Sequence, residues 1–100
     1  MDQIERISHY EELLDRVAAA AKGLELALEE YRAAQDAARE LDAYYGGEEW
    51  KQDFADDEAG KLPRDLKRGD LSEDAAYDAL CANRALLARM LETVTQALGD

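Results

Sequence analysis

The chain has 100 residues, with 24 Asp or Glu against 12 Lys or Arg, so its formal net charge is −12. A field of this sign repels nucleic-acid phosphates and anionic lipid, which argues against nucleic acid or a membrane as a partner. The length suits one domain, residues 1–100. One cysteine excludes an internal disulfide, and no signal-peptide or membrane-spanning pattern is present, so we expect a cytoplasmic protein.

Residues 2–43 are predicted to form one long amphipathic helix. Apolar or aromatic residues recur three and four positions apart, which is the spacing of one helix face. Gly23 lies within the pattern, but the spacing keeps its phase across this glycine, so the helix is expected to continue until Gly46-Gly47. The residues of this face are Ile7, Tyr10, Leu14, Val17, Ala21, Leu24, Leu28, Tyr31 and Ala38.

Residues 46–71 are predicted to form a connector with short helices. The segment 48–58 has two acidic residues where a helix begins, and Trp50 and Phe54 share one face because they are four apart. Gly60 is expected to end this helix. Pro63 suits the start of a further turn, which would end before Gly69.

Residues 72–98 are predicted to form the last helix, capped by Asp70 or Ser72. Its apolar face is interrupted by Arg84. Cys81 lies beside Leu80 and is expected to be a half-buried, inert thiol. The residues of the face are Tyr77, Leu80, Leu87, Leu91, Val94 and Leu98.

These elements predict an all-α protein: a long antiparallel helical hairpin with a short helical, loop-rich connector packed on it. At 1.5 Å per residue, the first helix spans roughly 63 Å and the last roughly 40 Å. If the last helix starts beside Tyr44, the apolar residues at the other end of the first helix remain uncovered; they are Ile4, Ile7, Tyr10 and Leu14. A second copy of the chain could cover them, so we expect a homo-oligomer, most simply a dimer.

The acidic part of the connector is a weak candidate for a metal site. Glu49, Asp53 and Asp56 lie on one helix face, with Asp57 beside them, and clusters of carboxylates bind Mg²⁺ or Mn²⁺. The order of an EF-hand and the Glu-x-x-His motif of di-iron bundles are both absent from the sequence. The alternative interpretation is a solvated acidic face, so no metal or other cofactor is predicted.

The basic part of the connector is a weak candidate for an anion-binding site. It contains Lys61, Arg64, Lys67 and Arg68, which could hold a phosphate group. The alternative is internal, since residues 46–60 carry six acidic side chains and one basic one. Ion pairs between the two parts would then fix how the connector folds back.

The aromatic and large apolar residues of the connector and its borders are expected to pin it in place. They are Tyr44, Tyr45, Trp50, Phe54, Leu62, Leu66 and Tyr77. The alternative is a ligand pocket or a patch that binds a partner. No catalytic residue is predicted. His9 falls opposite the apolar face of its helix, where solvent exposure is expected.

The chain resembles domain-of-unknown-function family 4298, a family of small bacterial proteins. The segments that carry the resemblance are Tyr44-Tyr45-Gly46, Glu49-Trp50, Asp53-Phe54, Asp57–Pro63, Asp65–Gly69, Leu71–Asp74, Gln3–Ile7 and Glu12–Asp15. Gly47 and Asp70 depart from the family pattern, in which Ser and a small apolar residue are expected. The resemblance implies a helical cytoplasmic protein and brings no activity, so it assigns no catalytic residue.

The sequence therefore favours a non-enzymatic interaction or scaffold protein that associates with itself or with an unidentified protein. Two alternatives remain. The first is a small enzyme or binding protein that uses the connector's acidic and basic residues on a metal or phosphate ligand. The second is an acidic mimic of nucleic acid, which the net charge of −12 suggests.

Overall fold

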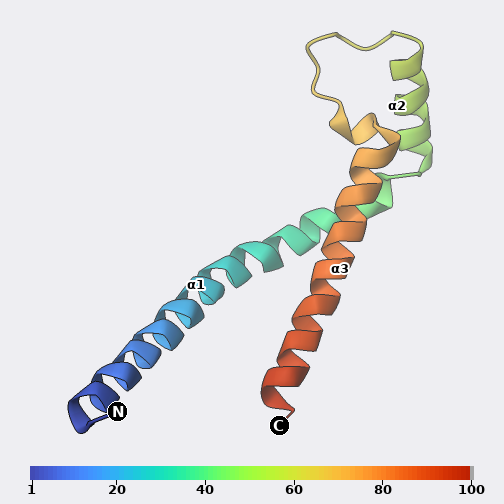
Figure 1. Cartoon of the computed structure of the whole chain (residues 1–100). Coiled ribbons are helices and arrows are strands. Elements are labelled where there is room, and N and C mark those ends of the chain that lie inside the picture. Colours follow the sequence, from blue (N-terminus) through green and yellow to red (C-terminus); the bar gives the residue numbers. More distant parts are fainter. Residues whose placement is uncertain (100) are drawn as a thin grey trace. The chain divides into compact units, whose positions relative to one another are not determined.

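The computed structural model describes residues 1–99 and confirms the predicted all-α class. Its elements are α1 (Gln3–Tyr44), α2 (Glu48–Glu58), the short 3-10 helix η1 (Gly69–Leu71) and α3 (Glu73–Leu98), with no strand anywhere in this range (Figure 1). The ends of the three α-helices lie within two residues of the predicted positions. None of the described helices is both long and apolar enough to cross a bilayer.

The chain divides into two compact units, Met1–Ala37 and a second unit that begins at Ala38. The predicted antiparallel packing of the long helices concerns the placement of these units and stays a prediction. Most of α1 makes up the first unit. Asp2 caps this helix, because its Oδ1 accepts a hydrogen bond from the backbone N–H of Glu5 at 2.8 Å. The same bond lowers the pKa of the Asp2 carboxyl, since it favours the charged form.

Helix α1 runs through Gly23 without a break, as predicted. A methyl group in place of the Gly23 hydrogen would meet no atom within 4 Å. None of the residues of α1 is buried. The apolar face of this helix therefore finds no core inside its own unit.

The turns of the second unit follow the predicted glycines. Gly46, with φ +77°, follows α1, and Gly60, with φ +71°, follows α2. At the end of α2 the N–H of Lys61 donates to the carbonyl of Asp56 at 2.9 Å, and the N–H of Gly60 donates to the carbonyl of Asp57 at 3.0 Å. This is a Schellman arrangement, in which glycine adopts the left-handed conformation without a steric penalty.

The core of the second unit is small and lies where the connector meets α3. Leu71 in η1 and Ala76 in the first turns of α3 are the buried apolar residues of the described chain. Ser72 caps α3, since its Oγ accepts the N–H of Ala75 at 3.4 Å. Figure 1 shows the loop after α2 returning through η1 into the start of α3. The connector is therefore held at its second end by burial of Leu71.

One predicted turn is only partly correct. Pro63 begins a single turn closed by the N–H of Leu66 on the Pro63 carbonyl at 3.3 Å, and the chain does not become helical there. The helical turn forms later, at Gly69–Leu71. The reason is tertiary, because the carbonyl of Asp70 in this turn accepts a hydrogen bond from Trp50.

Candidate functional site

Three aromatic rings line one side of α2 and the turn before it. Trp50 and Phe54 are stacked with ring centroids 5.2 Å apart, and the ring of Tyr45 meets Trp50 edge-on at 5.1 Å. The indole Nε1 of Trp50 donates to the carbonyl of Asp70 at 2.9 Å. Burying the apolar part of an indole while its N–H finds an acceptor is the usual arrangement for Trp. This group therefore joins the start of the connector to its end.

Asp53 contributes a second tie between α1 and α2. The hydroxyl of Tyr44 donates to Oδ2 of Asp53 at 2.6 Å, a short distance typical of a bond to a charged acceptor. This bond, followed by desolvation and the negative charge of Asp53, raises the pKa of Tyr44 to about 12. The carboxylate is therefore engaged in holding the α1–α2 turn.

Asp57 and Arg68 form the closest ion pair of the connector. The guanidinium Nη1 of Arg68 lies 3.0 Å from Oδ1 of Asp57, and both side chains are about two-thirds or more covered. The same Nη1 lies 3.5 Å from the carbonyl of Pro63, at the limit of hydrogen bonding. The predicted pairing of the acidic part with the basic part is therefore found at this point.

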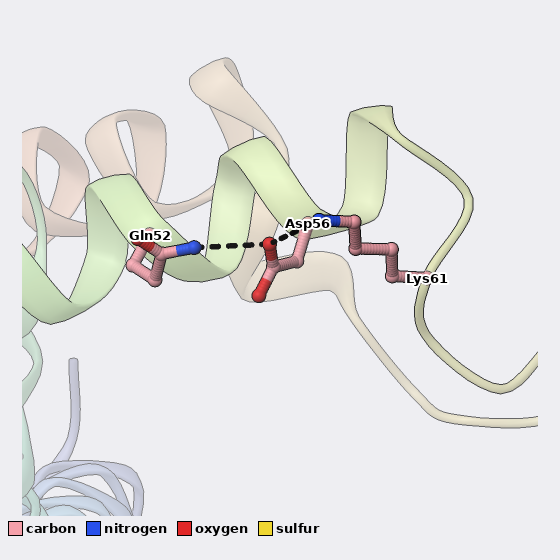
Figure 2. Close-up of polar contacts among 3 residues, drawn as sticks. All are labelled: Gln52, Asp56 and Lys61. Atoms are coloured by element: carbon pink, nitrogen blue, oxygen red, sulfur yellow. Dashed lines mark hydrogen bonds and ion pairs between the residues drawn. The ribbon is translucent and has the colours of Figure 1, made fainter.

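Asp56 has two weaker partners (Figure 2). Its Oδ1 accepts a hydrogen bond from Nε2 of Gln52 at 3.0 Å and lies 4.0 Å from Nζ of Lys61. The Lys61 side chain is 70% exposed, so water screens this pair and its contribution to stability is small.

The four acidic candidates for a metal site do not point toward one centre. Asp53, Asp56 and Asp57 have different partners, and Glu49 is exposed. In the part of the chain that the structure describes, no three Asp, Glu, His or Cys residues are grouped so that they could hold a metal ion. The geometry is that of residues which order a connector.

The four basic candidates for an anion-binding site do not form one group either. Lys61 and Arg68 lie beside carboxylates, as described above, whereas Arg64 and Lys67 are exposed on the loop between α2 and η1. A hollow of about 570 Å³ adjoins Arg68 and is wide open to solvent. Its lining residues are Phe54, Asp57, Glu58, Arg68, Leu71 and Ser72. Since the guanidinium of Arg68 is already paired with Asp57, this hollow does not present a free anion-binding site.

A smaller hollow of about 210 Å³ was missed by the sequence analysis. It is lined by Asp42, Tyr45, Tyr77, Leu80, Cys81 and Arg84. The sequence feature that could have indicated this hollow is Arg84, because it interrupts the apolar face of α3.

The expectation of a half-buried Cys81 is wrong, because the thiol is exposed. The covered positions in this part of α3 are Ala76, Leu80 and Asn83, at helical spacing i, i+4 and i+7, and Cys81 lies beside this face. A hydrogen bond with Cys81 raises the pKa of the Tyr77 hydroxyl.

The remaining predicted connector residues are less covered than expected. Leu62 is half-buried, Leu66 is 48% exposed and Tyr77 is 58% exposed. The aromatic clasp is therefore formed by Tyr44, Tyr45, Trp50 and Phe54.

The apolar face of α1 is exposed to solvent along most of its length. Seven large side chains of its apolar stripe expose between 37% and 76% of their surface; they are Ile4, Ile7, Tyr10, Leu14, Val17, Leu24 and Leu28. We call this set the α1 stripe. The apolar face of α3 is also exposed, from 41% at Leu87 to 82% at Leu98. Both helices therefore present large apolar side chains to solvent.

The fold and these surfaces define a small helical protein with one long, exposed helix and an ordered connector. The chain belongs to the family described as domain of unknown function (DUF4298), whose model matches residues 7–93. No curated protein and no solved structure matches the chain significantly.

Proposed function

We propose that this protein is a non-enzymatic, cytoplasmic interaction module that associates with a second copy of itself through the α1 stripe. One observation carries the proposal: the stripe extends over seven helical turns and has no buried residue. Full burial of each large apolar side chain is worth roughly 1.5–3 kcal/mol. Several such side chains together supply the free energy that a dimer needs in order to offset the cost of association.

The connector supports this proposal by its chemistry. Three of the four acidic candidates, Asp53, Asp56 and Asp57, are engaged with Tyr44, Gln52 and Arg68 and so take part in ordering the connector. The alternative hypothesis, that the protein is an acidic mimic of nucleic acid, rests on its net charge alone. Competition with DNA for a basic protein would test that alternative.

The experiment compares two leucines of equal exposure on opposite sides of α1. Leu14 belongs to the stripe and is 60% exposed, and Leu26 lies on the other side and is 61% exposed. A buried charge is costly, so we expect Leu14→Asp to abolish the concentration-dependent increase in mass seen by light scattering. Leu26→Asp should leave it unchanged. Equal behaviour of the two variants would contradict the proposal.

A further inference from the structure

The proposed dimer has an orientation that the side chains of α1 determine. From Ile7 to Tyr31 the apolar residues of α1 follow a heptad repeat over four heptads, which is long enough to indicate a coiled-coil type of pairing. Two helices can then run parallel or antiparallel, and these arrangements bring different residues together. The inference below rests on the proposed function and concerns residues of the first unit only.

We propose that two copies of α1 pair antiparallel, with Glu11 of each copy beside Arg32 of the other. Both residues are exposed and lie on the same flank of the stripe, because they are 21 positions, or three heptads, apart. In an antiparallel pair like flanks face each other, so this flank meets its own copy in reverse order. The two-fold axis then creates two identical Glu–Arg pairs.

The core residues fit the same register. In it Leu14 lies opposite Tyr31, Ala21 opposite Leu24, and Val17 opposite Leu28 of the second copy. These three layers combine side chains of complementary size, and the next layer toward each end pairs Tyr10 with Gln35. A parallel pair would place Ala21 against Ala21 and Tyr31 against Tyr31, leaving one layer underfilled and another crowded.

The flanking charges have different partners in the two orientations, which makes the orientation testable. In a parallel pair Glu11 would approach Arg6 of the second copy, and Arg32 would face the uncharged Ala27. Arg32 therefore forms an ion pair with the second copy only in the antiparallel arrangement. Antiparallel pairing also separates the two acidic helix starts, since residues 1–15 carry five acidic side chains and one basic one.

The first test is a charge reversal followed by its rescue. We expect Glu11→Arg and Arg32→Glu each to raise the dimer dissociation constant, measured by sedimentation equilibrium, by roughly three- to tenfold. The double variant should return it to within about twofold of the native value. Glu12→Arg and Arg16→Glu are matched controls on the outer side of the helix, and they should change the constant by less than about twofold.

Two results of this series would overturn the inference. If Arg32→Glu has no effect and the double variant remains as weak as Glu11→Arg, the helices are parallel. If none of the variants changes the constant, another surface, such as α3 of either copy, covers the stripe. Circular dichroism of each variant verifies that the helix is retained.

A distance measurement gives the orientation independently of affinity. Spin labels at Ser8→Cys, in a Cys81→Ser background, should be about 44 Å apart in the antiparallel dimer, because residue 8 lies opposite residue 37. A parallel dimer would place them within about 20 Å. A dimer with the short distance overturns the orientation and leaves self-association intact. A monomer at every concentration contradicts both proposals.

Discussion

Replacing Trp50 by alanine tests whether the aromatic group holds the connector in its folded form. The change removes the hydrogen bond from Nε1 to the Asp70 carbonyl, which is worth about 0.5–1.5 kcal/mol. It also removes the stacked contact with Phe54 and the edge contact with Tyr45, each worth roughly 0.5–1.5 kcal/mol. Because Trp50 is only half-buried, we expect a total loss of about 2–4 kcal/mol from the free energy of unfolding.

Trp50→Phe separates the two contributions. It keeps an aromatic ring beside Phe54 but removes the donor, so its cost should be about 1 kcal/mol. Both variants are measured by urea unfolding followed by circular dichroism, with hydrogen exchange of residues 48–72 to localise the effect. Leu66→Ala is the control, since Leu66 is a 48% exposed residue of the same connector and should cost less than about 0.5 kcal/mol. If Trp50→Ala costs no more than Leu66→Ala, the aromatic group does not order the connector.

Three further predictions concern single contacts. The raised pKa of Tyr44, about 12 against an ordinary 10, means that its hydroxyl form stabilises the fold below pH 10, and that this contribution is lost as the pH rises toward 12. Tyr44→Phe, which also leaves Asp53 without this donor, should remove that part of the pH dependence of urea unfolding, and an unchanged profile would refute the assignment. Arg68→Gln should lower the free energy of unfolding by about 1 kcal/mol or less, because its pair with Asp57 is partly screened, and a larger loss would show that the ion pair is stronger than its exposure implies. Gly23→Ala should raise the thermal stability of α1 by about 0.5–1 kcal/mol, since the added methyl group meets no neighbour; a loss would show that a partner chain packs against this position.

The sequence was sufficient for features that depend on local signals. The continuity of α1 through Gly23, the turns at Gly46 and Gly60 and the cap at Ser72 are determined by residues within a few positions of each other. The stacking of Trp50 on Phe54 also follows from a spacing of four. The continuity of α1 and the two glycine turns were predicted for that reason, Ser72 was one of two predicted caps, and a shared helix face was predicted for Trp50 and Phe54.

Features that depend on tertiary contacts were not accessible in the same way. The bond between Tyr44 and Asp53 requires the angle of the α1–α2 turn, and the helical turn at Gly69–Leu71 forms where the Asp70 carbonyl meets an indole twenty residues earlier in the chain. The exposure of Cys81 likewise depends on which face of α3 the connector and the end of α1 cover. A helix periodicity indicates which face is apolar, but not how far along the helix a neighbour covers it.

The connector and the α1 stripe have separate roles in the protein. The ties of Tyr44, Trp50 and Arg68 are all made within the second unit, so they order the connector without using the stripe. Variants of the clasp should therefore lower the stability of the second unit while leaving the association of α1 largely unchanged. The two properties can be measured separately, because the residues that carry them belong to different units of the chain.

The most direct test of self-association is the mass of the native protein in solution as a function of concentration. Light scattering over a dilution series should show a transition from one chain to two, and the dimer should persist at high salt because apolar burial provides most of its free energy. A mass of one chain at every concentration would contradict the account.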